Sequence, residues 1–271
     1  MLKRFLCSLV VSLLPSIYPG TSCADTASTP LGNLSRANGG RSLLVAVPGT
    51  VFTRLEKGAP VGVMAEVTDI ILRRMGFSPV FIGMSMKEIL GAIRDNQIGA
   101  SSLIVMTPKN KDAVLFTDPV VDEYTTIVTR QGEGFPLNQL SDLWGRKIAG
   151  RQGYHYPMLE KDPNIQIERY RSDGEVIRNL LLHKVDLVLI STLSNIYSFR
   201  VEGVMDKLEI LPIAVGIVPL RIALSPKEFS AGDLAQFNTR LQQLRGEPAW
   251  QDILARNGFA DLIHTWPILE K

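Results

Sequence analysis

The segment from Gln152 to Pro157 combines groups that are suited to holding a small molecule. Here Gly153 is followed by Tyr154, His155 and Tyr156. We expect a helix to start at this point, and the free backbone N–H groups of a helix start attract anions. The aromatic rings could stack on a flat ligand. The segment is therefore a candidate binding site, with coverage of the protein surface as the alternative role of the rings.

Side chains suited to catalysis are few in this chain. The three histidines, His155, His183 and His264, are scattered, and none has a serine, cysteine or aspartate at a spacing typical of nucleophilic catalysis. The two cysteines, Cys7 and Cys23, fall within the first 24 residues. Metal sites usually need clustered His and Cys ligands, and no Gly-rich phosphate loop is present. We therefore predict no catalytic residue, no metal site and no cofactor.

The first 24 residues follow the order of a secretory signal peptide. Lys3 and Arg4 form a positive start, Phe5 to Leu14 is largely apolar, and Ser22-Cys23-Ala24 places small residues at the cleavage position. A retained anchor is an alternative, but a membrane span needs about 20 apolar residues. Lipid attachment at Cys23 is another, although the leucine usual three residues earlier is absent. We predict cleavage after Ala24 and location in the periplasm.

Removal of the signal peptide changes the charge balance. The full chain has 29 basic and 27 acidic residues, and the signal peptide holds two of the basic ones and none of the acidic ones. The mature chain thus carries 27 of each and a formal net charge of zero. This balance gives no reason to expect binding to nucleic acid or to an anionic membrane. Residues 25–41 are rich in Ser, Thr, Gly and Asn and are predicted to be a flexible leader.

Strand and helix patterns alternate from Ser42 onward, which favours an α/β fold with parallel strands and helical crossovers. The helices are expected at 64–75, 86–95, 192–200, 231–245 and 248–256, with another opened by a capping box at Ser172-Asp173-Gly174-Glu175. The strands are expected at 43–47, 80–82, 103–105, 147–150, 165–167 and 185–190, with a short helical turn at 138–143.

The same pattern occurs twice, which predicts two lobes. The runs 124–129 and 220–225 look like extended strands that cross between them. We predict that lobe one comprises residues 42–127 with 221–271, and that lobe two comprises residues 128–220. Each lobe is expected to be a mainly parallel sheet flanked by helices.

Four sequence blocks resemble the family of periplasmic solute-binding proteins that serve amino-acid ABC importers, family 3. The best block runs from Thr107-Pro108-Lys109-Asn110 to Phe116-Thr117-Asp118-Pro119 and is similar to the family's T-P-E-R…F-S-D-P-Y. The others are Leu140 to Ile148, Gln152-Gly153, and Lys184 to Val188. The resemblance covers residues 42–260 and implies a type II periplasmic-binding-protein fold. It also implies a ligand held between two lobes that close on it.

The family's amino-acid clamp is altered in this chain. In the family an arginine of the T-P-E-R segment grips the α-carboxylate and an aspartate of lobe two pairs with the α-ammonium. Here Asn110 stands at the arginine position and Ser191 at the aspartate position, while Met64 replaces an acidic residue. Losing one partner of a buried charge pair costs about 3–5 kcal/mol. The resemblance therefore implies a ligand other than a standard amino acid; Lys109 or Lys111 could supply a substitute cation.

These observations predict a periplasmic solute-binding protein rather than an enzyme. We expect a monomer that binds a small-molecule ligand and works with a membrane permease or a membrane sensor, without nucleic acid. The alternatives are an accessory or regulatory protein with the same fold, favoured if Phe52, Met64 and Tyr154 fill the cleft, and a periplasmic enzyme on this fold. The predicted ligand-binding residues are Phe52, Met64, Ser102, Thr107, Asn110, Gly153, Tyr154, His155 and Ser191.

Overall fold

The computed structural model describes residues 40–263 and 265–269. The predicted signal peptide and all but the end of the predicted leader lie outside these residues. The helices are α1 (Val63–Arg74), α2 (Met86–Arg94), α3 (Asp173–Leu181), α4 (Thr192–Val201), α5 (Ala231–Arg245) and α6 (Pro248–Arg256). The strands are β1 (Arg41–Val47), β2 (Arg54–Glu56), β3 (Ala59–Val61), β4 (Phe77–Gly83), β5 (Ala100–Val105), β6 (Leu115–Phe116), β7 (Val121–Arg130), β8 (Ile148–Arg151), β9 (Ile167–Tyr170), β10 (Leu187–Ser191) and β11 (Leu208–Leu224). Two 3₁₀ turns lie at Leu140–Leu143 and Met205–Lys207.

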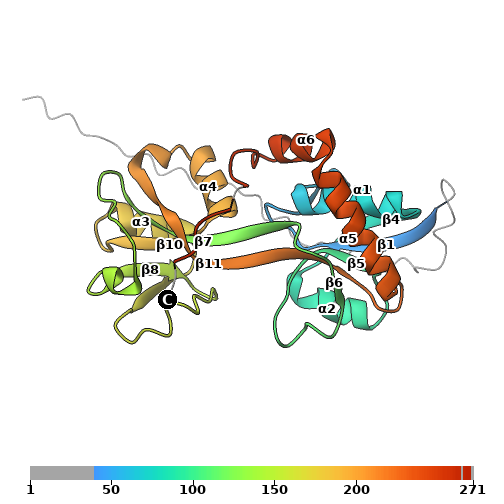
Figure 1. Ribbon diagram of the computed structural model, residues 1–271, viewed down its shortest axis with the longest axis horizontal. Coiled ribbons are helices and arrows are strands. Elements are labelled where there is room, and N and C mark those ends of the chain that lie inside the picture. The colour runs from blue at the N-terminus through green and yellow to red at the C-terminus, as the bar shows by residue number, and fades with distance from the viewer. Residues whose placement is uncertain (1–39, 264, 270–271) are drawn as a thin grey trace, which may run out of the picture. The chain divides into compact units, whose positions relative to one another are not determined.

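The main sheet has the strand order β4-β1-β5-β11-β7-β10-β8-β9, with β6 paired to β11 (Figure 1). Strand β1 runs parallel to β4 and β5, and β8 runs parallel to β9 and β10. These two parallel groups are the two lobes of a mixed α/β fold, as predicted. We call the β1, β4 and β5 group with α1, α2, α5 and α6 lobe one, and the β8, β9 and β10 group with α3 and α4 lobe two.

Two long antiparallel strands join the lobes. Strand β7 pairs with β10 of lobe two, and β11 pairs with β5 of lobe one and with β7. The predicted run 124–129 lies inside β7, and the predicted run 220–225 lies in β11 except for its last residue. Strand β11 is much longer than expected, because shifts of register between Ile210 and Gly216 absorb the breaks that Pro212 and Gly216 would otherwise make. Between Gly216 and Leu220 the pairing with β7 is regular.

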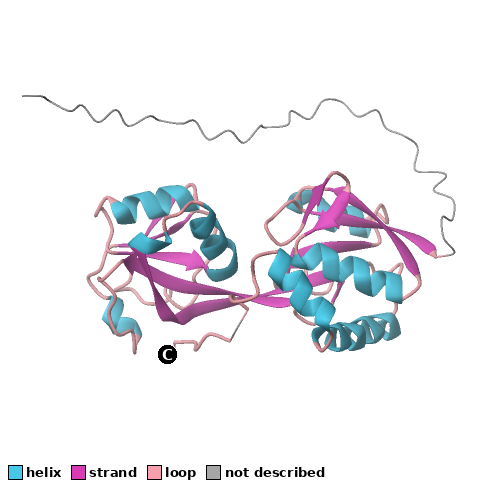
Figure 2. Cartoon of the chain, turned by 90° about the horizontal axis from the view of Figure 1, so that it is seen from above, coloured by secondary structure: helices cyan, strands magenta, loops and turns pink. Residues whose placement is uncertain are grey.

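Helices cover both faces of the sheet (Figure 2). Successive side chains of β1 point to opposite faces and are buried on both. Leu43 and Val45 belong to the largest apolar cluster, with Ile71 of α1 and Phe237 of α5. Ala46, on the opposite face, belongs to a second cluster that contains residues of α2. Burial on both faces explains why this strand is a continuous apolar run in the sequence.

Two local expectations differ from the structure. Strand β9 starts at Ile167, whereas the sequence pattern places a strand at 165–167. The reason is a turn in which the Ile165 N–H donates to the Asp162 carbonyl, 3.1 Å away. The helix expected after Gly153 is also absent, since residues 157–161 form turns. The phenol of Tyr156 folds back instead and accepts a hydrogen bond from the Arg151 N–H at 3.2 Å.

The last described residues pack on lobe two. Ala214 of β11 donates to the Pro267 carbonyl and accepts from the Leu269 N–H, both at 2.8 Å. The Leu269 side chain is 2% exposed and lies in a cluster with residues of β8 and β10. The chain after α6 therefore returns to the crossover strand β11. The residue limits of the two lobes proposed from the sequence stay a prediction.

Candidate functional site

Phe52 and Met64 lie in the hydrophobic core of lobe one. Phe52 is 7% exposed, and its ring centroid lies 5.7 Å from that of Phe259. The Met64 side chain is fully buried, and its N–H donates to the Phe52 carbonyl at 2.9 Å. Gly62 permits this approach, because it has a positive φ of 104° and a Cβ there would lie 2.4 Å from the Phe52 oxygen. Both predicted contacts thus face the core.

Ser102 is also buried and has its partners within lobe one. Its hydroxyl lies 2.5 Å from the hydroxyl of Thr53 and donates to the Ala46 carbonyl at 3.1 Å. This network connects β5 to β1 and to the loop before β2. The Ser102 hydroxyl is therefore engaged in holding these elements together.

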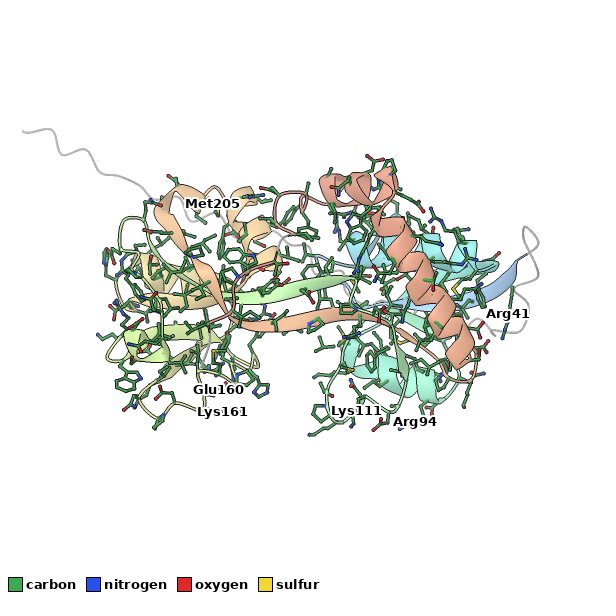
Figure 3. All side chains as sticks on the ribbon, in the orientation of Figure 1. Arg41, Arg94, Lys111, Glu160, Lys161 and Met205 are labelled. Atoms are coloured by element: carbon green, nitrogen blue, oxygen red, sulfur yellow. The ribbon has the colours of Figure 1, made fainter. Side chains whose placement is uncertain are left out.

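Thr107 and Asn110 are brought together in one turn after β5. The Asn110 side-chain oxygen accepts from the Thr107 N–H at 2.7 Å, and its amide nitrogen donates to the Val105 carbonyl at 3.0 Å. Asn110 is only 6% exposed. Both polar atoms of its side chain are thus used to close the turn. Lys109 and Lys111 are exposed, and Lys111 is labelled in Figure 3 at the edge of the molecule.

Gly153, Tyr154 and His155 form an exposed segment of lobe two. Gly153 has a φ of +83°, a backbone conformation that glycine adopts readily. The Tyr154 ring is 42% exposed, and the Arg151 guanidinium lies over it, 5.2 Å from the centroid. The His155 imidazole lies 3.9 Å from the Glu160 carboxylate. Aromatic and charged groups are thus presented together at this surface.

Ser191 is the N-cap residue of α4. Its N–H donates to the side-chain oxygen of Asn195 at 3.1 Å. Within the described residues, no hydrogen bond or ion pair links Phe52, Met64, Ser102, Thr107 or Asn110 with Gly153, Tyr154, His155 or Ser191. The predicted site residues therefore fall into one group in each lobe.

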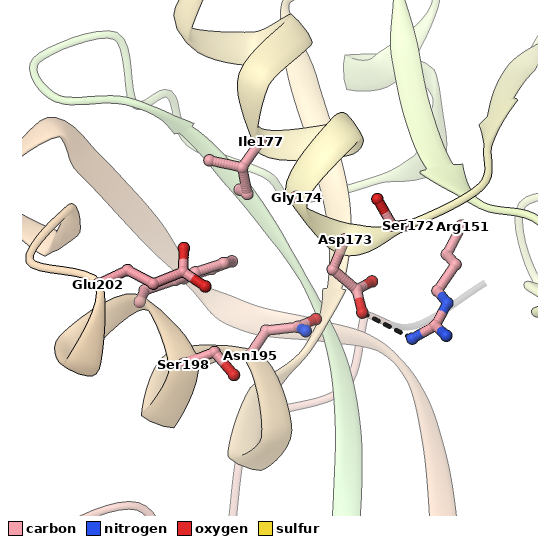
Figure 4. A pocket seen from close by; sticks show the side chains of 9 residues that line it. Arg151, Ser172, Asp173, Gly174, Ile177, Asn195, Ser198 and Glu202 are labelled. Atoms are coloured by element: carbon pink, nitrogen blue, oxygen red, sulfur yellow. Dashed lines mark hydrogen bonds and ion pairs between the residues drawn. The ribbon is translucent and has the colours of Figure 1, made fainter. Parts of the chain in front are cut away.

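A polar pocket of about 280 Å³ lies between α3 and α4 of lobe two. Figure 4 shows side chains of the two helices around this space, with Arg151 at one side. The Arg151 guanidinium and the Asp173 carboxylate are 2.7 Å apart. The pocket is lined by Arg151, Ser172, Asp173, Gly174, Ile177, Asn195, Ser198, Phe199 and Glu202. Its groups include both charges and uncharged hydrogen-bonding side chains, which suits a small polar ligand.

The predicted capping box at the start of α3 is half present. The Ser172 hydroxyl accepts from the Glu175 N–H at 3.2 Å, which is the expected N-cap interaction. The Glu175 carboxylate accepts from the Arg171 N–H at 2.9 Å rather than from that of Ser172. This cap fixes the helix start that places Asp173 beside Arg151.

Sequence reasoning missed Glu123, a buried acidic residue on crossover strand β7. It is 6% exposed, and burial raises the pKa of its carboxyl to about 8. Hydrogen bonds from the first turn of α4 lower that pKa but do not offset the burial. A signal was present in the sequence, since Asp122 and Glu123 interrupt an otherwise apolar and β-branched run. The sequence did not show which of the two carboxylates faces inward.

Four large apolar side chains are exposed near the crossover strands. Val105 is the last residue of β5 and Met106 follows it, whereas Ile217 and Val218 lie on β11. Each is between 36% and 46% exposed. The pairing of Val105 with Leu220 brings the end of β5 close to Val218 along the sheet. Exposed apolar groups gathered in this way often mark a contact surface for a ligand or a partner.

Metal ligands do not cluster in the part of the chain that the structure describes: no group of three His, Cys, Asp or Glu side chains is placed to hold an ion. None of the described helices is long and apolar enough to cross a membrane.

Solved structures with the same fold include several ligand-binding proteins. A substrate-binding protein of an ABC uptake transporter from Streptococcus pneumoniae, with bound histidine, is 15% identical, with a TM-score of 0.59 over 83% of this chain and 95% of that chain. A binding component of an ABC transporter from Wolinella succinogenes, complexed with lysine, is 16% identical, with a TM-score of 0.61 over 81% and 96%. A histidine kinase sensor domain similar to periplasmic binding proteins is 21% identical, with a TM-score of 0.59 over 81% and 97%.

At these identities the likeness establishes the two-lobed periplasmic-binding-protein fold. No curated protein sequence gives a significant match to this chain. A family model does match, over residues 45–259, which is most of the chain. The resemblance seen in the four sequence blocks is thereby confirmed: the chain belongs to the bacterial extracellular solute-binding proteins of family 3.

Proposed function

We propose that this protein is a periplasmic binding protein that captures a small ligand between its lobes and presents it to an ABC importer. The observation that carries the proposal is the pair of lobes joined by β7 and β11, with a polar pocket on lobe two lined by Arg151, Asp173 and Asn195. Family membership supports a binding role, and the signal-like residues 1–24 support export to the periplasm. The exposed apolar groups at the crossover strands add surface that a ligand can cover.

The ligand differs, in this proposal, from a standard amino acid. The clamp arginine of the family corresponds to Asn110, whose amide is already engaged in the turn after β5. The aspartate of the family corresponds to Ser191, which carries no charge. The Arg151 and Asp173 side chains of the pocket are already paired with each other at 2.7 Å, so a zwitterion at the two family positions meets no unpaired opposite charges and loses several kcal/mol of binding free energy. The lysine and histidine found in the similar structures therefore do not transfer to this chain.

The proposal is tested with the mature chain, starting at Asp25. Native mass spectrometry of the purified protein should reveal a bound small molecule that is released on denaturation. Thermal denaturation against a metabolite panel should then give a rise in melting temperature with compounds of the same class, because a ligand that binds only the folded state stabilises it.

Variants of two residues that line the pocket test whether the ligand binds there. Arg151→Ala and Asp173→Asn should reduce the ligand-induced rise, since both side chains line the pocket. Arg54→Ala is the matched control, because Arg54 forms an exposed pair with Glu56 on the β2–β3 hairpin. A panel in which no compound stabilises the protein, together with no co-purified molecule, would contradict the proposed function.

A second candidate function is that of a regulator that contacts a membrane sensor. The burial of Phe52 and Met64 in the core of lobe one favours it, because neither side chain is then available to contact a ligand. The similar sensor domain of a histidine kinase supports the idea. Deletion of the gene distinguishes the two functions. Loss of ligand uptake indicates transport, whereas normal uptake with loss of a transcriptional response to the ligand indicates a regulator.

A further inference from the structure

Glu123 lies where the crossover strands meet the first turn of α4. Its carboxyl oxygen Oε1 accepts hydrogen bonds from the Ser194 N–H at 3.4 Å and from the Ser194 hydroxyl at 3.2 Å. Ser194 is the third residue of α4, so the contact is made at the positive end of the helix dipole. Of the two carboxyl oxygens of Glu123, Oε1 therefore has hydrogen-bond donors within the protein.

The other carboxyl oxygen, Oε2, is buried and has no hydrogen-bond partner in the described part of the chain. Among the described residues, no lysine, arginine or histidine forms an ion pair with Glu123. A buried polar atom without a partner is costly to folding, so native proteins keep few of them and many have a functional reason. The unused oxygen of Glu123 can therefore accept from a donor that the described residues do not supply.

Several charged groups on the elements that pack against β7 have partners other than Glu123. On β11, Arg221 donates to the Thr117 carbonyl, and on α4, Arg200 forms an ion pair with Asp261. Asp173 of α3 pairs with Arg151. On β11, the Glu209 carboxylate accepts from the N–H groups of residues 132 and 134. Strand β10 has no charged side chain.

The neighbour of Glu123 on crossover strand β11 is apolar. Val218 is its direct partner on β11, so the two side chains lie on the same face of the crossover strands, and Val218 is 36% exposed. Burial raises the pKa of Tyr154, the Arg151 charge lowers it, and the nearby Asp173 and Glu123 charges raise it. A carboxyl group near an aromatic ring and an aliphatic surface is the combination that recognises an organic ammonium ion.

We propose that Glu123 is the anionic anchor of the ligand site and binds the ammonium group of an organic cation whose apolar part covers Val218. This inference rests on the proposed function and names its ligand class. Glu123 would supply, from the crossover strand, the negative charge that Ser191 lacks. Because Oε2 is shielded, the ligand reaches it when the lobes move about β7 and β11, a hinge motion common in two-lobed binding proteins.

The protonation of Glu123 should make the affinity for a cation depend on pH. Because the pKa of Glu123 is raised to about 8, its carboxyl is mostly neutral at pH 7. A cation that pairs with it favours the carboxylate, and the proton is released to the buffer. The affinity for a permanent cation should therefore rise about tenfold per pH unit between pH 6 and pH 7.5 and level off above pH 8.

The experiment uses matched probes on the mature protein. Choline is compared with its uncharged analogue 3,3-dimethylbutan-1-ol, and putrescine with butane-1,4-diol, within a panel that also contains anions and sugars. Titration calorimetry in two buffers of different ionisation enthalpy counts the protons released. Glu123→Gln keeps the shape and the acceptor for Ser194 but cannot become negative. Glu209→Gln on β11 is the control, since its side chain contacts residues 132 and 134.

The expected result is binding of at least one cation, but not of its neutral analogue, with release of about one proton below pH 8. Glu123→Gln should weaken this binding at least tenfold and abolish the proton release, whereas Glu209→Gln should do neither. Cation binding that survives in Glu123→Gln overturns the inference. Binding of only neutral or anionic compounds also overturns it and leaves the proposed function standing. If no compound binds, both proposals fail together.

Discussion

Glu123 on crossover strand β7 is hydrogen-bonded to Ser194 in the first turn of α4, through both the backbone N–H and the hydroxyl of the serine. These residues are 71 positions apart, so the contact exists only once lobe two has formed against the crossover strand. The Glu123 carboxyl group therefore connects the crossover strands, about which the lobes move, to the first turn of α4. Its protonation state should affect both the stability of the fold and the binding of a charged ligand.

The first prediction concerns stability and pH. Burial raises the pKa of Glu123 from its ordinary value of 4.5 to about 8. Between these values the folded protein holds a proton that the unfolded chain has lost, so this group lowers stability as pH rises through the window. Glu123→Gln removes that loss. Its free energy of unfolding relative to wild type should therefore increase by on the order of 3–5 kcal/mol from pH 4.5 to pH 9.

Urea denaturation of both proteins across this pH range measures the effect. Because other groups titrate in both proteins, only the difference between the two curves is informative. Parallel curves for wild type and Glu123→Gln would show that the pKa of the Glu123 carboxyl is the same in the folded protein as in the unfolded chain. That result would contradict the burial described above.

The second prediction concerns the turn after β5. Asn110→Ala leaves the Thr107 N–H and the Val105 carbonyl without their partner, which should cost about 1–3 kcal/mol of folding free energy. Asn110→Asp should be intermediate, because a carboxylate can accept from the Thr107 N–H but cannot donate to Val105. Urea denaturation at pH 7 compares the three proteins. An Asn110→Ala protein as stable as wild type would mean that this amide is free to contact a ligand.

Local signals in the sequence were sufficient for much of the fold. Helices α5 and α6 occupy the predicted residues, because Ser230 and Asp233 form a capping box before one and Pro248 occupies the first position of the other. The parallel strands were visible in the sequence as short apolar runs. Such features depend on neighbours within a few residues, which the sequence displays directly.

The candidate site depends on contacts between distant residues, and the sequence showed less of it. The burial of Glu123 follows from the packing of α4, which begins almost 70 residues later. The turn after Gly153 forms because the Tyr156 phenol bonds to the Arg151 backbone, and no periodic pattern signals that contact. Asn110 was identified as a departure from the family clamp, but its role in closing a turn became visible only in three dimensions.

The third prediction distinguishes core packing from ligand contact at Phe52. Since Phe52 is buried against Phe259, Phe52→Ala should destabilise the protein by about 3–5 kcal/mol. Phe52→Leu retains most of the apolar volume and should cost clearly less. Thermal and urea denaturation give the stabilities, and titration with the ligand found by mass spectrometry gives the affinities. A normal stability of Phe52→Ala combined with weak ligand binding would assign Phe52 to the site and not to the core.

The fourth prediction concerns the chain after α6, which crosses to lobe two and pairs with Ala214 of β11. Leu269→Ala should cost about 2–4 kcal/mol, because this side chain is 2% exposed in the apolar cluster of lobe two. Ile268→Ala is the matched control, since its side chain is 42% exposed and its backbone pairing with Ala214 is unchanged. It should cost well under 1 kcal/mol. Equal losses for the two variants in urea denaturation would show that backbone pairing, rather than burial of Leu269, holds this segment in place.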